Sequence, residues 1–494
     1  MRNIKRELCI CLLLVSLILL VGCGASAPGS GANGGAGDYY YGSMGGNSYL
    51  ELKEKGFSNT ADNNKVNLSL DTSTASYSNI RKLINANIPI SKDAVNIEQM
   101  LNYFSYSYVN ETEEQLTSFL EISKCPWNEE NHLLSVAIKA KDYELSPNVQ
   151  NNNFVFLLDV SGSMYSYDKL PLMIEAFNIL VNNLGDYDSV SIVTYAGSNQ
   201  VLLDGGRGYE KTKISAIISD LEASGSTAGA QGIQTAYQLA SKYFIPGGNN
   251  RVFLATDGDF NVGISSTSEL KNFISEKRDS GIYLSIFGFG DGNLRADIMD
   301  TLSQAGNGNY YYIDTVLEAQ KVFVSELGGT LQTVAKDAKV QIEFNQDIVE
   351  KYRVIGYENK YLTDEEFNDS ETDAGEIGAG HTTVCLIEIK LYEAYDAAVL
   401  PIVKSTIRYK DVLDNEMNKE VINECSSVTI DASIDFIFQS CVAEFGLLLR
   451  ASEYANPNLN NILIRLNNDR FKEDVYKAEF ISLVNKYGQK NSGQ

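Results

Sequence analysis

Strand-like and helix-like patterns alternate through the middle of this chain, and this alternation constrains the fold more than any other feature. Short apolar runs of strand length are followed by longer stretches in which apolar residues recur at helical spacing. Such alternation predicts an α/β fold, a doubly wound and mostly parallel sheet with helices on both faces. The strand-like runs are Phe154–Leu158, Val190–Tyr195, Arg251–Ala255, Tyr283–Phe287 and Tyr310–Ile313, and the helical segments are Leu170–Leu184, Ile233–Tyr243, Leu270–Arg278 and Val316–Leu327.

Oxygen-bearing side chains follow two of these runs. Asp159, Ser161 and Ser163 form an Asp-x-Ser-x-Ser pattern directly after the first run, and Asp257 follows the third. In sheets of this kind, ligands bind outside the carboxyl ends of the strands. Carboxylate and hydroxyl oxygens are the ligands that hard cations such as Mg²⁺ prefer. The pattern therefore predicts a divalent-cation site at this edge of the sheet.

At these residues the chain resembles a von Willebrand factor type A domain. The metal-ion-dependent adhesion site of that domain combines Asp-x-Ser-x-Ser with a distant threonine and a distant aspartate. The resemblance implies that Thr227, in the SGST loop, and Asp257, in the ATDG turn, complete the ligand set around Asp159, Ser161 and Ser163. It also implies a bound Mg²⁺, with Mn²⁺ or Ca²⁺ as alternatives.

Further stretches resemble a group of bacterial lipoproteins that carry this domain between family-specific N-terminal and C-terminal extensions. That resemblance implies a fold and a metal site, but no defined activity. The stretches are residues 71–79, 102–104, 255–263, 355–359, 373–381 and 443–450.

The N-terminus has the charge order of a secretory signal. Basic residues precede the apolar run Leu8–Val21, which is too short to favour a spanning helix. The run ends in Gly22-Cys23, which resembles the lipobox of bacterial lipoproteins. We therefore expect a signal peptide over residues 1–22 and lipid on Cys23, so that the protein is exported and anchored to the cell membrane or outer envelope. A signal-anchor helix with an incidental cysteine is the alternative.

The negative net charge of the chain limits the classes of partner that it can bind. The chain has 40 basic and 64 acidic residues and a formal net charge of −24. Nucleic acid is excluded as a favoured partner because its phosphates are also negative. The same charge opposes an anionic lipid surface, so membrane attachment is expected to depend on the lipid.

Composition and patterning divide the rest of the chain. We expect a flexible Gly/Ser-rich tether after the lipidated cysteine over 23–62, an N-terminal α+β extension over 63–148, the A domain over 149–333 and a second mainly-β plus α region over 334–494. In that last region, strands are predicted at 339–344, 383–390, 399–409 and 427–430, and helices at 435–450 and 473–486. The strand-like residues 116–139 either pair with this later sheet, which makes the A domain an insertion, or form a separate N-terminal domain.

The cysteines outside the signal and the lipid site show no metal-binding spacing, so a zinc site is not expected. Disulfides and buried free thiols both remain open. These residues are Cys125, Cys385, Cys425 and Cys441.

Catalytic interpretations are weaker than cation binding. A phosphotransfer aspartate at Asp159 would need a second acid at the position of Ser161, and no GxSxG motif surrounds the serines. Ser166 to Lys169 fits SxxK, but the companion motifs are absent. The glycines of 288–292 lack the GK[ST] of a phosphate loop. His381 lies in a glycine-rich, turn-like setting that favours a structural role. We therefore predict no enzymatic activity.

The expected function is cation-dependent binding of a protein that offers a carboxylate to the metal. Two alternatives are retained. One is an exported hydrolase whose site lies in the C-terminal region and whose A domain recruits a target. The other is an envelope scaffold in which the metal only stabilises the fold.

Overall fold

The computed structural model describes residues 46–70, 72–142, 152–225, 229–258, 266–326, 333–393, 401–414 and 417–492. The predicted signal peptide (1–22), Cys23 and most of the predicted tether lie outside these ranges. Among the described residues, every helix is too short or too polar to cross a lipid bilayer.

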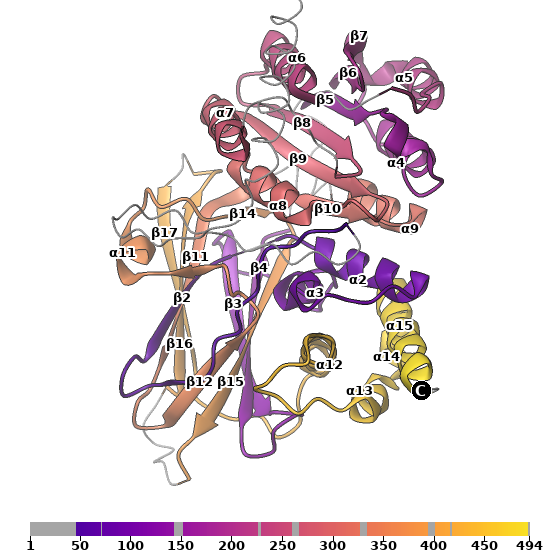
Figure 1. Cartoon of the computed structure of the whole chain (residues 1–494). Coiled ribbons are helices and arrows are strands. Elements are labelled where there is room, and N and C mark those ends of the chain that lie inside the picture. The colour runs from indigo at the N-terminus through magenta and orange to yellow at the C-terminus, as the bar shows by residue number, and fades with distance from the viewer. Residues whose placement is uncertain are drawn as a thin grey trace, which may run out of the picture. The chain divides into compact units, whose positions relative to one another are not determined.

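The predicted mostly parallel sheet is present in the middle of the chain (Figure 1). Its strands are β5 (Asn152–Asp159), β6 (Ser189–Tyr195), β7 (Asn199–Arg207), β8 (Asn249–Thr256), β9 (Ile282–Phe289) and β10 (Tyr310–Ile313). They lie in the order β10-β9-β8-β5-β6-β7, and only the β6–β7 pair is antiparallel. The predicted fold class is confirmed.

Helices cover both faces of this sheet, as Figure 1 shows. One face packs against α4 (Leu170–Asn182), α5 (Lys211–Ser219) and α9 (Val316–Gln320), and the other against α6 (Gly229–Lys242), α7 (Thr267–Asp279) and α8 (Ala296–Ala305). In the central strand β5, Phe154 and Phe156 enter the first core and Val155 and Leu157 the second. A strand buried on both faces has no polar alternation, which explains its continuous apolar sequence.

The remaining strands form two antiparallel sheets. The first has the order β1-β12-β15-β4-β3, and the second the order β13-β2-β11-β16-β17, with β14 paired to β11. The strands of the first sheet are β1 (Ser58–Asn59), β3 (Leu116–Lys124), β4 (His132–Ala140), β12 (Val349–Ile355) and β15 (Thr382–Leu391). Those of the second are β2 (Lys65–Ser69), β11 (Thr333–Phe344), β13 (Tyr361–Leu362), β14 (Gly375–Gly378), β16 (Val403–Asp411) and β17 (Met417–Cys425).

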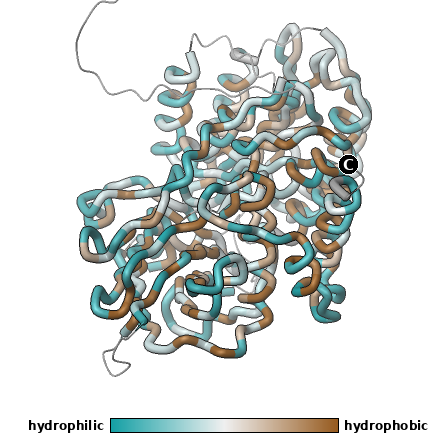
Figure 2. The backbone as a smooth tube through the Cα atoms, turned by 60° about the horizontal axis from the view of Figure 1, so that its bottom comes forward, coloured by the Kyte–Doolittle hydropathy of each residue, from teal (hydrophilic) through white to brown (hydrophobic). Residues whose placement is uncertain are grey.

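These two sheets and a group of helices form three layers, which we call the base. One apolar core lies between the sheets, and a second lies between the first sheet and the helices. The helices are α2 (Ala75–Ala86), α3 (Ile97–Asn102), α12 (Ile434–Arg450), α13 (Leu459–Leu466), α14 (Asp469–Lys472) and α15 (Val475–Ser492), and the small α11 (Asp364–Asn368) lies beside the second sheet. Figure 2 shows mainly hydrophilic residues along the outer loops.

The residues before the A domain belong to the same sheets as those after it. β4 pairs with β15 from Lys139↔Thr382 to His132↔Ile389, and β2 pairs with β11. Of the two arrangements considered from the sequence, the structure therefore has the one in which the A domain is inserted within a second domain. β4 is buried on both faces, because the second sheet packs on one side of the first sheet and helices cover the other.

Two expectations need correction. The tether was predicted to reach residue 62, but residues 46–62 are held by the fold: Tyr49 and Leu52 are buried, and the Ser48 amide donates to the Leu294 carbonyl at 2.8 Å. Apolar side chains scattered among glycines and polar residues supply enough burial here. The strand predicted at 427–430 is absent, because Ile430 is 94% exposed and the strand pairing of β16 is taken by β17.

Candidate metal centre

The two predicted aspartates lie at the same edge of the parallel sheet. Asp159 is the last residue of β5, and Asp257 immediately follows β8. β5 and β8 are parallel neighbours with Leu158 opposite Ala255, so both carboxylates leave the sheet at its carboxyl edge. Both side chains are buried. The topology therefore brings together two acids that are 98 positions apart in the sequence.

The serines of the Asp-x-Ser-x-Ser pattern curl back over Asp159. The Ser161 amide donates to Asp159 Oδ1 at 2.8 Å, and the Ser161 and Ser163 hydroxyls lie 3.0 Å apart. A short 3-10 turn over Gly162–Tyr165 places Ser163 on the exposed side. The three side chains thus run from a buried carboxylate to a solvent-facing hydroxyl.

Asp159 lies in a buried, polar environment. The Thr256 hydroxyl donates to Asp159 Oδ2 at 3.3 Å. Burial raises the pKa of Asp159 to about 6, and the nearby Asp257 carboxylate adds to the rise. A cation beside the two carboxylates would stabilise the charged form of both.

Thr227 lies outside the described residues, so its predicted role stays a prediction. The start of its loop is described and is bonded to the Asp-x-Ser-x-Ser segment. The Ser224 amide donates to the Val160 carbonyl at 2.8 Å, and the Gly162 amide donates to the Gly225 carbonyl at 3.0 Å. Gly225 has φ +79°, a conformation that favours glycine.

A lysine that the sequence had not placed in the site contacts Asp257. Lys169 Nζ donates to Asp257 Oδ2 at 2.8 Å and to Asn293 Oδ1 at 3.3 Å. From the sequence, Lys169 was considered only as part of an SxxK motif. Since it is 88 positions from Asp257, no local pattern pointed to this pairing.

The donor set fits a hard divalent cation. Within the described ranges, His, Cys, Asp and Glu side chains do not gather in groups of three or more that could hold a metal. The candidate site instead combines the carboxylates of Asp159 and Asp257 with the hydroxyls of Ser161 and Ser163, all of which are oxygen donors. Oxygen donors of this kind suit Mg²⁺, Mn²⁺ and Ca²⁺ rather than zinc.

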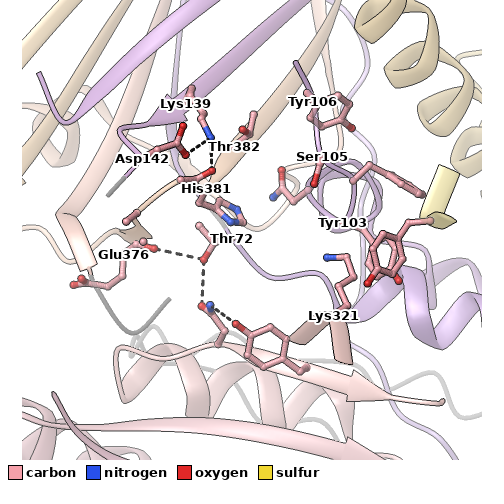
Figure 3. A pocket seen from close by; sticks show the side chains of 18 of the residues that line it. Thr72, Tyr103, Ser105, Tyr106, Lys139, Asp142, Lys321, Glu376, His381 and Thr382 are labelled. Atoms are coloured by element: carbon pink, nitrogen blue, oxygen red, sulfur yellow. Dashed lines mark hydrogen bonds and ion pairs between the residues drawn. The ribbon is translucent and has the colours of Figure 1, made fainter. Parts of the chain in front are cut away.

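His381, the residue considered for a hydrolase, lies elsewhere. It lines a cavity of about 730 Å³ whose wall includes Lys139 and Glu376 (Figure 3). The His381 amide donates to the Gly378 carbonyl at 3.3 Å, and Lys139 Nζ donates to Asp142 Oδ1 at 3.0 Å. These bonds hold a turn, but neither of them involves the His381 imidazole, so the role of that side chain stays a prediction.

Three family models match separate parts of the chain. The one described as "von Willebrand factor type A domain" matches residues 153–324. The one described as "Uncharacterized protein YfbK, C-terminal" matches residues 329–489, and the one described as "von Willebrand factor" matches residues 43–135. The A domain and both of its flanking regions thus have counterparts in known families.

Similar proteins and structures were also found. "Uncharacterized protein YfbK" of Escherichia coli (strain K12) is 39% identical over 463 residues, which are 88% of this chain and 80% of that protein. "Uncharacterized protein sll0103" of Synechocystis sp. is 26% identical over 203 residues, 40% of this chain and 45% of that protein. The solved structure "von Willebrand factor type A from Catenulispora acidiphila" aligns with a TM-score of 0.43 and 14% identity over 78% of this chain and 90% of that chain.

Proposed function

The chain belongs to the family of the Escherichia coli protein YfbK, and from this premise we propose that it binds another protein through a divalent cation held by its von Willebrand factor type A domain. We further propose that it is exported and anchored to the cell envelope by lipid on Cys23. The partner offers a carboxylate. The observation that carries the proposal is the convergence of Asp159, Ser161 and Ser163 at the carboxyl edge of the sheet.

Each residue of the candidate site would have a distinct role toward the ion. Asp159, Ser161 and Ser163 would contact the ion directly, with Asp257 beside it and Thr227 as the remaining expected ligand. A bound Mg²⁺, Mn²⁺ or Ca²⁺ would supply an electrophilic position at which a partner's carboxylate can be held. Ser163 lies on the solvent side, so this position would face outward.

The surface beside the site suits a protein partner. Tyr165 and Tyr167 follow Ser163 and are 83% and 82% exposed. Exposed tyrosines provide apolar contact area with a hydrogen-bonding tip, and they are enriched in protein interfaces. They would surround a carboxylate contact with area that excludes water.

Metal binding is tested first. Thermal unfolding of the wild type is measured in EDTA and in 5 mM Mg²⁺ or Mn²⁺, alongside Asp159→Ala and the matched control Asp204→Ala, which removes a surface carboxylate of the same domain. We expect the cation to stabilise the wild type and the control, and not Asp159→Ala. If neither cation changes the unfolding temperature of the wild type, the proposal is contradicted.

Partner binding is tested next. Crosslinking in intact cells, with and without chelator, is followed by pull-down of the wild type and Asp159→Ala. We expect a crosslinked protein that is lost in EDTA, returns with Mg²⁺ and is missing from the variant. If chelation lowers the unfolding temperature but leaves every crosslink unchanged, the metal serves only the fold, and the scaffold alternative holds.

A further inference from the structure

Lys169 and Asp257 form a buried ion pair at the edge of the candidate metal centre. Their contact is 2.8 Å, and the side chains are 11% and 0% exposed. Asp159, by contrast, pairs with no cationic side chain in the described part of the chain: its hydrogen-bond partners there are neutral groups, among them the Ser161 amide and the hydroxyls of Thr256 and Tyr195. Of the two acids of the centre, Asp257 is therefore paired with a cationic side chain and Asp159 is not.

The position of Lys169 is unfavourable for its helix. Lys169 is the N-cap residue of α4, and a cation at a helix N-terminus is opposed by the helix dipole. Serine, threonine, aspartate and asparagine are the residues that stabilise this position. The lysine is therefore not explained by capping, and its contact with Asp257 is the compensating interaction.

The surrounding structure guides the lysine to Asp257. Gly290, in the turn after β9, has φ +70°, and a Cβ atom there would lie 2.5 Å from Lys169 Cγ and Cε. Only glycine leaves room for the lysine stem. Asn293, from the same turn, accepts from Lys169 Nζ. The aliphatic stem of Lys169 is enclosed, and its ammonium group donates two hydrogen bonds. The surrounding structure therefore fixes the position of this side chain.

The preceding residue is held from the base. Lys82, in α2, donates to Asp168 Oδ2 at 2.7 Å, and the Ser166 hydroxyl donates to Asp168 Oδ1 at 2.7 Å. The segment that carries Lys169 is thus fixed on one side by the base and on the other by the turn after β9.

We propose that Lys169 is a positioning residue that neutralises Asp257, so that the centre presents one uncompensated carboxylate, Asp159, to a divalent cation. This assignment rests on the proposed function and deepens it. With one negative charge balanced internally, the site binds the cation less tightly and leaves more of its positive charge for a partner's carboxylate.

The test measures Mn²⁺ binding to the full-length protein. The free Mn²⁺ signal in electron paramagnetic resonance gives the dissociation constant for wild type, Lys169→Met, Lys169→Arg and the control Lys242→Met. Lys242 pairs with Asp204 at 2.7 Å on the surface of the same domain, so its replacement makes the same charge change outside the centre. Thermal unfolding in EDTA shows that each variant is folded.

We expect Lys169→Met to bind Mn²⁺ about tenfold more tightly than the wild type. The reason is that a neighbouring charge changes proton binding to a carboxylate by a factor of about ten or more, and a divalent cation senses the same field. Lys169→Arg and Lys242→Met should stay within about twofold of the wild type, since the first keeps the charge and the second changes a screened surface pair.

Two results would overturn the assignment, and they are distinguishable. Equal or weaker Mn²⁺ binding by Lys169→Met, with normal binding by the wild type, overturns the role of Lys169 and leaves the proposed function intact. No Mn²⁺ binding by the wild type overturns the proposed function and this assignment together.

Discussion

Arg81, in α2 of the base, donates through Nε to Asp314 Oδ2 at 2.8 Å, although the two residues are 233 positions apart. Asp314 follows β10 of the A domain. The same guanidinium donates to Glu318 Oε2 at 2.7 Å and to Glu479 Oε2, in α15, at 2.7 Å. One arginine thus joins the A domain to two helices of the base.

Loss of this arginine should be costly. Arg81, Asp314 and Glu318 have side chains no more than 2% exposed, so Arg81→Met leaves two buried carboxylates without their main cation. Breaking a buried ion pair in this way costs about 3–5 kcal/mol. Urea unfolding should show that loss, whereas Arg408→Met, which removes the exposed pair with Glu420, should cost less than about 1 kcal/mol. Equal effects of the two variants would show that the network contributes little.

The base should fold only when residues 46–142 and residues 333–492 are both present. β4 lies between β15 and β3, and β2 pairs with β11, so a fragment of residues 333–492 lacks strands in both of its sheets. We expect this fragment alone to show no cooperative unfolding by circular dichroism, and co-expression with residues 46–142 to restore it. The fragment 152–326 is the control, since it retains its own sheet and both cores. Cooperative unfolding of 333–492 alone would contradict the shared-sheet arrangement.

The cysteines should differ in reactivity. The four described cysteines are free: Cys125, Cys385 and Cys441 are buried, and Cys425 is partly exposed. Burial raises the pKa of the buried thiols, so little thiolate is present at pH 8. Iodoacetamide labelling read by peptide mass spectrometry should modify Cys425 at least about tenfold faster than the others. In guanidinium the four rates should converge. A cysteine peptide that is labelled only after treatment with a reductant would show a disulfide and contradict the free state.

Asp159 should make the metal-free stability depend on pH. Its pKa is raised to about 6 in the folded protein, against about 3.9 in an unfolded chain. The folded state therefore binds more protons between these values, and its stability falls as pH rises through this window, by up to about 3 kcal/mol. Above pH 6 in EDTA, Asp159→Asn should be more stable than the wild type, and at pH 4 the two should agree. Urea unfolding at a series of pH values checks this. If the free energy of unfolding changes with pH in the same way for both proteins, the prediction is wrong.

Local patterns were sufficient to predict the A domain and to indicate which side chains gather at one edge of its sheet. The strand predicted at Tyr310–Ile313 coincides with β10, because a fully buried strand must be apolar throughout. Asp159, Ser161 and Ser163 meet because they are two residues apart on one turn, a geometry that short-range spacing already contains. β7 was missed for the opposite reason: it is an edge strand with mostly exposed side chains, so no apolar run marks it.

Other relationships required the tertiary structure. The sequence of residues 116–139 predicts strands, but it does not predict which strands they pair with. β4 and β15 are joined by backbone hydrogen bonds that any strand could form. The pairings of Lys169 with Asp257 and of Arg81 with Asp314 likewise depend on which elements pack together, and side-chain identity alone cannot report that.

The sequence by itself thus determined the class of the central domain and the close approach of three oxygen-bearing side chains, because both depend on periodicity and spacing within a few residues. Only the tertiary structure decided that the A domain interrupts a second domain, that residues 46–62 are part of the fold and that Lys169 balances one acid of the centre. These depend on contacts between distant segments, whose free energy is gained only after the chain has closed the loops between them.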